Sequence, residues 1–206
     1  MPYIIGLTGN IGAGKSEVVR VLRELGAESI DADRLGHEVM APGTPEWERL
    51  VARFGRDILQ ADDTVDRRKL GAIVFADPAA LADLERIVHP GVRARIRARF
   101  AATERPVIVV EAIKLLESGL YLEVDAVWVV VAAREVRVRR LVDTRGLTVA
   151  EAEMRVDAQT PEADKVARAD VVIENSGDRA ALRAQVVAAW QAVEAGTAPR
   201  RRGEPR

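Results

Sequence analysis

The sequence predicts an α/β fold, a parallel β-sheet with helices on both faces, and three observations support this class. Residues 106–110 and 126–131 are continuous, apolar and valine-rich runs, which is typical of strands buried on both faces of a parallel sheet. Each run is followed by apolar residues at helical spacing. The chain has 206 residues, 48% of them hydrophobic and 31% charged, which suits one well-packed domain with an insertion. Ligands of such sheets bind at the carboxyl ends of the strands.

The other elements follow in chain order. Residues 3–8 form a short β-prone run, which precedes a glycine-rich segment and a helical pattern that ends at Gly26. Further strands are predicted at 29–32 and 170–173, and a final amphipathic helix at 179–193. We expect a single domain of residues 1–195, in which the core (1–35 and 101–195) is interrupted by a helical insertion at about 36–100. Residues 196–206, rich in Pro, Gly and Arg, are predicted to be a disordered tail.

Charge and composition exclude several classes of function. The 31 Lys and Arg against 32 Asp and Glu give a formal net charge of -1, so there is no global electrostatic case for nucleic acid. The lack of Cys excludes disulfides, thiolate metal sites and a cysteine nucleophile, and it fits a reducing compartment. No apolar segment reaches the roughly 20 residues that span a bilayer. We expect a soluble, cytoplasmic protein, a monomer or small homo-oligomer, with neither nucleic acid nor membrane as a partner.

One motif indicates nucleotide chemistry. It fits G-x-x-x-x-G-K-[ST], lies between a predicted strand and a predicted helix, and consists of Gly9, Asn10, Ile11, Gly12, Ala13, Gly14, Lys15 and Ser16. Its backbone N–H groups and the following helix N-terminus, which includes Glu17, are expected to hold the phosphates of ATP. Lys15 is expected to bridge the β- and γ-phosphates, and Ser16 to offer its hydroxyl to Mg²⁺. The alternative, an ordinary glycine turn, is disfavoured by the flanking elements.

A phosphate-binding loop identifies a nucleotide and leaves the reaction open. A small-molecule kinase, a GTPase switch and an ATPase that drives motion or assembly all use such a loop. A GTPase should carry Asn-Lys-x-Asp, and the nearest match, at residues 175–178, lacks the Lys. An assembly ATPase would usually need further modules, and none is visible in the sequence. A kinase that transfers the γ-phosphate of ATP to a small-molecule hydroxyl therefore fits best.

A kinase also needs groups for the acceptor and for the transferred phosphate. Asp33, two residues after Asp31 at a predicted strand end, can orient an acceptor hydroxyl and take its proton; helix capping is the alternative, and the two roles are compatible. Arg140 is chosen from the five arginines of residues 134–145 as a lid residue that neutralises phosphoryl charge, although solvated surface charge is the alternative for each of them. Glu111 ends a predicted strand and can hold a water on Mg²⁺ or act as a surface cap.

Taken together, the motifs resemble those of the dephospho-coenzyme A kinases, which carry out the last step of coenzyme A synthesis. The resemblance extends from the N-terminus to about Trp190. It rests on the following segments in this order: Ile5-Gly-Leu-Thr-Gly-Asn-Ile-Gly-Ala-Gly-Lys-Ser16, Asp31-Ala-Asp33, Leu84-Glu-Arg-Ile-Val-His-Pro90, Leu115-Leu-Glu-Ser-Gly-Leu120, Arg140-Leu141, Arg145-Gly-Leu147, Arg155, Ala158-Gln159, Lys165, Ala169-Asp170 and Ile173-Glu-Asn-Ser-Gly177.

The resemblance implies a P-loop NTPase fold similar to that of nucleoside monophosphate kinases, with an acceptor-binding helical insertion and a lid at about residues 140–165. It implies that ATP, with Mg²⁺, phosphorylates the ribose 3′-hydroxyl of dephospho-coenzyme A. Asp33 would be the base, Thr8, His89 and Glu111 would lie near the acceptor, and Asn175 near the adenine of ATP. A nucleoside, a nucleotide or another small hydroxyl compound is the alternative acceptor.

Two positions depart from the family pattern. Residues 111–115 read Glu-Ala-Ile-Lys-Leu, where an Asp-x-Pro-Leu-Leu-type stretch is expected. Lys114 therefore brings a charge to a place where the family pattern is apolar. Thr144 stands where many relatives carry a second lid arginine, and Arg145 is expected to take over that contact.

Overall fold

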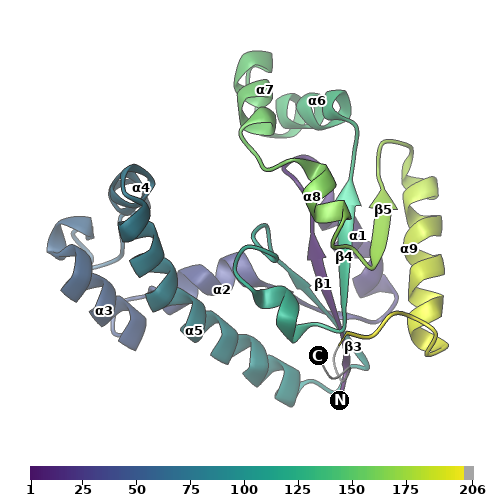
Figure 1. Cartoon of the computed structure of the whole chain (residues 1–206), viewed down its shortest axis with the longest axis horizontal. Coiled ribbons are helices and arrows are strands. Elements are labelled where there is room, and N and C mark those ends of the chain that lie inside the picture. The colour runs from purple at the N-terminus through teal and green to yellow at the C-terminus, as the bar shows by residue number, and fades with distance from the viewer. Residues whose placement is uncertain (202–206) are drawn as a thin grey trace. The chain divides into compact units, whose positions relative to one another are not determined.

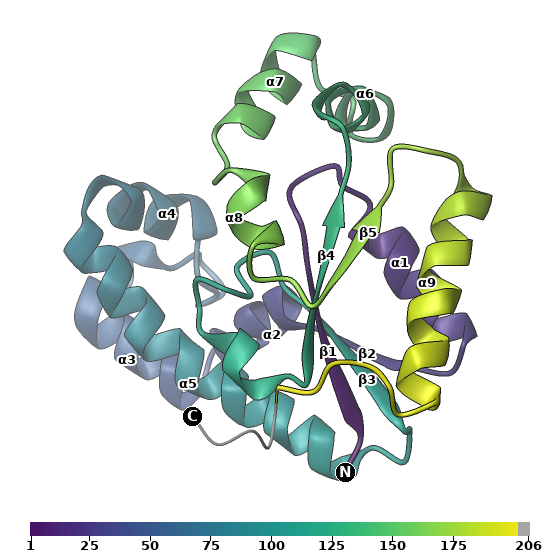
Figure 2. The ribbon, with the colours of Figure 1, turned by 45° about the vertical axis from the view of Figure 1, so that its right-hand side comes forward.

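The chain divides into two compact units in a computed structural model that describes residues 1–201. The core unit consists of Met1–Ile30 and of the chain from Thr103 onward, and the helical unit is Asp31–Ala102. The strands of the core unit are β1 (Tyr3–Thr8), β2 (Glu28–Asp31), β3 (Val107–Glu111), β4 (Ala126–Val131) and β5 (Val171–Glu174). Figure 2 labels β2, and Figure 1 labels the other four. The helices of the core unit are α1 (Lys15–Glu24), α6 (Arg134–Arg145), α7 (Val149–Asp157), α8 (Glu162–Val166), α9 (Arg179–Glu194) and the short η2 (Leu120–Glu123).

The five strands form one sheet in the order β2-β3-β1-β4-β5. β1 pairs in parallel with β3 and β4, and β4 pairs in parallel with β5. The register places Leu7 opposite Glu111 and Val131 opposite Glu174. The carboxyl ends of these four strands therefore meet at one edge of the sheet, where parallel α/β sheets bind their ligands.

One face of the sheet packs against α1 and α9, which lie side by side in both ribbon views (Figures 1 and 2). The buried cluster between them includes Trp128 of β4 and Trp190 of α9, so these two tryptophans serve packing. The opposite face carries Gly6, where an added Cβ would lie 2.9 Å from Leu115 and 3.0 Å from Val124. The connection from β3 to β4 therefore packs closely on that face, and only glycine fits beneath it.

The helical unit has a hydrophobic core of its own. It contains α2 (Ala32–Val39), α3 (Pro45–Phe54), η1 (Arg56–Ile58), α4 (Arg67–Ala76) and α5 (Pro78–Ala102). Leu50, Ile58, Leu70 and Val74 are buried together. The segment between η1 and α4 closes with a single antiparallel bridge between Leu59 and Val65. The helical insertion expected at about 36–100 falls inside this unit.

Local signals explain why the helices begin and turn where they do. The Thr44 side chain accepts a hydrogen bond from the Trp47 N–H at the start of α3, and Pro45 occupies the first turn. Pro90 lies inside α5, and an added Cβ on the next residue, Gly91, would meet the Glu46 carboxylate at 2.7 Å. The Glu46 side chain of α3 therefore lies close against the backbone of α5 at Gly91.

The start of α2 corrects one sequence-based alternative. Asp31 is the N-cap, and its carboxylate accepts a hydrogen bond from the Arg34 N–H at 2.9 Å. Asp33 lies in the first turn of the helix instead. Helix capping by Asp33 is therefore wrong, because α2 begins at Ala32, two residues before the helical pattern expected from Arg34.

The predicted disordered tail also needs correction for residues 196–201. Ala198 packs against the core cluster, the Tyr3 hydroxyl donates to the Pro199 carbonyl, and Arg201 donates to Asp170 and to the Arg168 carbonyl. The composition argument failed because polar contacts with the buried Asp125 and the partly buried Asp170 hold the segment, so that few apolar contacts are needed. The rest of the predicted tail, residues 202–206, lies outside the described residues.

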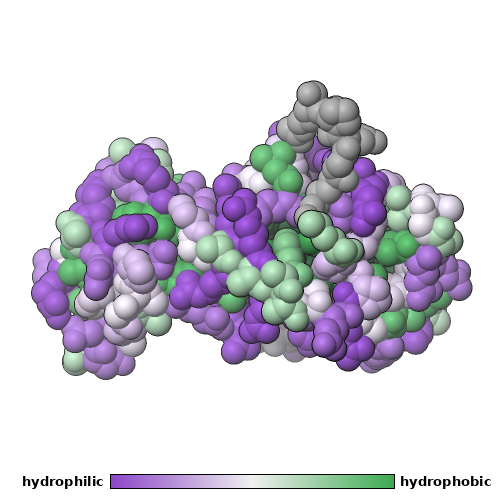
Figure 3. Space-filling model, turned by 90° about the horizontal axis from the view of Figure 1, so that it is seen from below, coloured by the Kyte–Doolittle hydropathy of each residue, from purple (hydrophilic) through white to green (hydrophobic). Residues whose placement is uncertain are grey.

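The surface is mixed in character. On the face shown in Figure 3, hydrophobic residues form small, separate areas among hydrophilic ones. Within residues 1–201, no helix has both the length and the apolar composition to cross a membrane.

Candidate active site

The phosphate-binding loop connects β1 to α1 in the geometry that its sequence predicts. Gly9, Gly12 and Gly14 have φ values of 154°, 75° and 96°, in the region that side chains other than glycine rarely adopt. An added Cβ would lie 2.4 Å from the Val130 carbonyl oxygen at Gly9 and 2.1 Å from Asn175 Nδ2 at Gly14. These two glycines are required both by backbone conformation and by close packing, so the alternative of an ordinary flexible turn is not supported.

The loop ends at the N-terminus of α1. Gly14 is the N-cap and offers no side-chain cap, so the first-turn N–H groups of α1 suit an anionic ligand. Lys15 Nζ lies 3.1 Å from the Gly9 carbonyl oxygen and thus reaches back across the loop. The Glu17 carboxylate pairs with Arg20 at 2.6 Å, which lowers its pKa, and the Glu17 N–H donates to the Gly14 carbonyl at 3.1 Å. The structure therefore gives no support to the predicted contact of Glu17 with ATP.

Ser16 fits a magnesium site of the kind that kinases use. Its side chain is exposed in the first turn of α1, beside the loop. Within residues 1–201 no group of three or more His, Cys, Asp or Glu could hold a metal by itself. A Mg²⁺ ion in a phosphoryl-transfer site typically takes only one or two protein oxygens and completes its shell with water and phosphates. A single hydroxyl beside a phosphate loop matches that pattern.

Arg140 and Asn175 both donate hydrogen bonds to backbone carbonyls of the phosphate loop. Arg140 Nη1 lies 3.2 Å from the carbonyl oxygens of both Gly12 and Ala13, and its Nη2 lies 2.7 Å from that of Asn175. The buried Asn175 side chain donates to the Ala13 carbonyl at 2.7 Å. Burial lowers the pKa of the Arg140 guanidinium, and neighbouring Arg139 lowers it further. These two residues, separate in sequence, therefore meet on the loop.

Helices α6 and α7 and the residues after them contact the phosphate loop. α6 and α7 pack through Val138, Leu141, Ala152 and Val156, and the Ile11 side chain joins this cluster. After α7, Gln159 Oε1 accepts the Ile11 N–H at 2.6 Å. The Thr160 carbonyl accepts from Asn10 Nδ2 at 3.2 Å. Residues 159 and 160, which follow α7, are thus bound directly to the phosphate loop.

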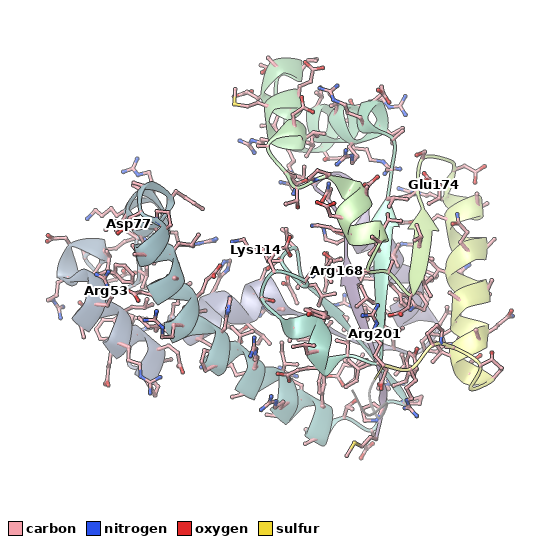
Figure 4. The ribbon with its side chains drawn as sticks, viewed as in Figure 1. Arg53, Asp77, Lys114, Arg168, Glu174 and Arg201 are labelled. Carbon is pink, nitrogen blue, oxygen red and sulfur yellow. The ribbon has the colours of Figure 1, made fainter. Side chains whose placement is uncertain are left out.

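Helix α8, which follows residues 159 and 160, contacts the loop after β3. Lys165 of α8 is buried, and its ammonium donates to the Ile113 carbonyl at 3.3 Å. The same carbonyl accepts the hydroxyl of the buried Thr8 at 3.1 Å. Glu111 ends β3, and Figure 4 shows Lys114 on the loop that follows. Thr8 and Glu111 therefore lie at the same edge of the sheet, and Lys165 of α8 contacts the loop beside them.

Arg137 of α6 and Glu162 of α8 form a buried pair of opposite charge. Two guanidinium nitrogens of Arg137 and one carboxylate oxygen of Glu162 are buried without a hydrogen-bond partner among the described residues. Burial raises the pKa of the Glu162 carboxyl, an effect that nearby Arg137 partly opposes. Gly12 packs on the backbone of Arg137, so this pair also borders the phosphate loop.

Two predicted residues belong to the helical unit. Asp33 lies in the first turn of α2, two residues after β2 ends, and His89 lies within α5 before Pro90. The core unit brings together the phosphate loop, Thr8, Glu111, Arg140 and Asn175.

Sequence reasoning missed the structural importance of Gln159 and Lys165. Both stand in the family motifs, yet neither was assigned to the site, because an isolated Gln or Lys in a polar stretch has no local pattern that predicts burial. Their positions depend on contacts with residues 148 and 52 positions away in the chain.

Comparisons with known proteins agree with this geometry. Residues 3–181 match the family model described as Dephospho-CoA kinase. A dephospho-CoA kinase of Symbiobacterium thermophilum is 45% identical over 205 residues, which cover 98% of this chain and 84% of the relative.

Solved structures agree as well. A dephospho-CoA kinase from Campylobacter jejuni superimposes with a TM-score of 0.70 at 29% identity and covers 95% of this chain and 99% of its own. A shikimate kinase from Acinetobacter baumannii shares the fold, with a TM-score of 0.55 at 17% identity and coverage of 95% of both chains. The fold is therefore that of the P-loop kinases, and the match to the family model along most of the sequence shows that this chain belongs to the dephospho-CoA kinase family.

Proposed function

We propose that this chain transfers the γ-phosphate of ATP to the ribose 3′-hydroxyl of dephospho-coenzyme A, which gives coenzyme A and ADP. The observation that carries the proposal is the family match over residues 3–181, which includes a phosphate loop with the required glycine geometry. We also keep the cytoplasmic location, and the absence of nucleic acid and membrane partners, as predictions from composition.

In the proposed reaction, the acceptor oxygen forms a bond to the γ-phosphorus while the bond from that phosphorus to the β,γ-bridging oxygen breaks. Asp33 orients the 3′-hydroxyl and receives its proton, and ADP leaves with the bridging oxygen. The N–H groups of the loop and the ammonium of Lys15 stabilise negative charge on the β- and γ-phosphates. Thr8, Glu111 and His89 form the acceptor site.

Mg²⁺, when bound to the phosphates, would neutralise charge on them, and Ser16 is the residue that would hold it. Arg140 reaches the loop carbonyls with its guanidinium, which supports a role beside the phosphates. We assign it to the transferred phosphoryl group and Asn175 to the adenine side of the ATP site. The proposed lid, at about residues 140–165, excludes water while ATP is bound.

The proposal is tested by ADP release from purified protein with Mg·ATP and a panel of acceptors. Dephospho-coenzyme A should stimulate release strongly, and nucleosides and nucleoside monophosphates should not. If only a control compound stimulates release, a P-loop kinase remains but its acceptor is different, and Lys114 is the first residue to exchange.

A further inference from the structure

We infer that Lys165 is a positioning residue for the acceptor: through the Ile113 carbonyl it holds the loop of residues 112–117 against the end of β1. This inference rests on the proposed function, and it adds a residue to which no part of that mechanism assigns a role. It concerns the core unit alone, since Lys165, Ile113 and Thr8 all lie there.

Lys165 is buried although it carries a charge. The side chain is 4% exposed, and its nearest carboxylate, Glu117, is 3.9 Å away and 42% exposed. A lysine is almost never buried without a close partner, because desolvation of the ammonium costs free energy that an apolar side chain would not. A half-exposed carboxylate at 3.9 Å offsets little of this cost, so the hydrogen bond to Ile113 is the main contact of the ammonium.

Lys165 and Thr8 donate to the same backbone carbonyl, that of Ile113. The Ile113 oxygen accepts from Lys165 Nζ at 3.3 Å and from Thr8 Oγ1 at 3.1 Å. Thr8 is the residue before Gly9, whose carbonyl accepts from Lys15. One backbone oxygen thus connects α8, the end of β1 and the loop after β3.

The loop that these contacts hold is residues 112–117. Residues 112–117 begin directly after Glu111 and include Lys114, the charged departure from the family pattern. A loop that presents groups to a ligand must be held in place, because each side chain or segment ordered on binding lowers affinity. Loss of the Lys165 contact should therefore weaken acceptor binding and leave ATP binding nearly unchanged.

The test compares Lys165→Met, which keeps length and removes charge, with Lys165→Arg, which keeps a buried donor. Lys165→Met should raise the KM for dephospho-coenzyme A about tenfold, as expected for loss of a hydrogen bond from a charged donor, with the KM for ATP within about twofold of the original. Lys165→Arg should recover most of the loss. Glu117→Gln should have little effect, since the carboxylate contact is long and exposed.

A merely structural lysine would behave differently. Val186→Ala in α9 serves as a control, because it destabilises the core unit without touching the loop and should leave both KM values unchanged. If Lys165→Met lowers the melting temperature as Val186→Ala does and the acceptor KM stays the same, the inference is overturned. Should Lys165→Met not fold, Lys165→Gln replaces it.

Amide hydrogen exchange separates this inference from the proposed function. In the absence of any substrate, residues 112–117 of Lys165→Met should exchange faster than in the unchanged protein, whereas their exchange in Val186→Ala should change no more than that of the whole unit. Unchanged exchange in the loop refutes the positioning role. If the loop loosens as expected but dephospho-coenzyme A is not phosphorylated by the unchanged protein, the proposed function fails and the positioning role survives.

Discussion

Asp33 is the residue on which the proposed chemistry depends most. Helix capping, the alternative role for Asp33, is excluded because Asp31 caps α2. Asp33→Asn keeps the size and the hydrogen-bonding capacity of the side chain and removes its basicity. We expect turnover to fall by a factor of at least about 100, in line with general-base catalysis, while ATP affinity changes little.

Single-turnover kinetics and calorimetric titration with ATP measure the two effects separately. Asp31→Asn is the matched control, because asparagine is an equally good N-cap. Turnover by Asp33→Asn at the original rate would remove Asp33 from the mechanism.

Tyr3 gives a residue-scale prediction about pH. Burial, together with Asp125 and Asp170, raises the pKa of its phenol to about 12. Because the folded protein holds this proton more tightly than the unfolded chain, the contribution to stability is complete below pH 10 and is lost as the pH rises through 12. The loss amounts to about 1 to 3 kcal/mol. Absorbance titration at alkaline pH and urea unfolding at pH 9 and 11 should show it, and Tyr3→Phe should show no such component.

At the scale of elements, the segment between α7 and α8 is hydrogen-bonded to the phosphate loop through Gln159 and Thr160. Gln159→Ala removes the acceptor of the Ile11 N–H and should weaken ATP binding about fivefold, the effect of one ordinary hydrogen bond. Gln159→Glu keeps the acceptor and adds a negative charge beside the phosphates, so it should weaken ATP binding further. Calorimetry measures both, with the exposed Gln191→Ala of α9 as control. Equal ATP affinity in all three variants would show that this contact does not support the loop.

The C-terminal segment is a second element-scale feature. Arg201 donates its backbone N–H to the Asp125 carbonyl at 2.7 Å and its side chain to Asp170, and Arg168 and Arg201 lie together in Figure 4. Asp125 and Asp170 immediately precede β4 and β5, so the contacts fall at the amino ends of the strands, away from the site.

Termination after Gly196 should therefore lower the free energy of unfolding by about 2 to 4 kcal/mol, because it removes partners of the buried Asp125 and the partly buried Asp170. Activity well below the melting temperature should persist. Denaturant unfolding measures the loss, and Arg179→Ala, which breaks only an exposed ion pair at 3.8 Å, is the control. A truncated chain as stable as the complete one would show that the segment contributes nothing.

Elements were predicted well wherever their signal is local. Strands β3 and β5 lie within one residue of the predicted runs, since continuous valine-rich sequence has few alternatives. The glycine positions of the loop were also predicted, because the motif encodes its own backbone geometry. Composition alone misjudged residues 196–201, whose order depends on carboxylates far away in the sequence.

At the scale of the whole molecule, the predicted functional residues are divided between the two units. The phosphate loop, Thr8, Glu111, Arg140 and Asn175 belong to the core unit, and Asp33 and His89 to the helical unit. The contacts of Asn175 and Lys165 with loops far away in sequence were not predictable, since no local pattern encodes them. The acceptor was predicted from several family motifs that occur in a fixed order. No single motif identifies it.

The identity and position of the product test the central claim most directly. Purified protein is incubated with dephospho-coenzyme A and Mg·ATP, and the product is analysed by mass and by phosphorus NMR against authentic coenzyme A. The account predicts one coenzyme A per ADP, with the new phosphate on the ribose 3′-oxygen. A phosphate at another position, or ADP formed without phosphorylated acceptor, would contradict it.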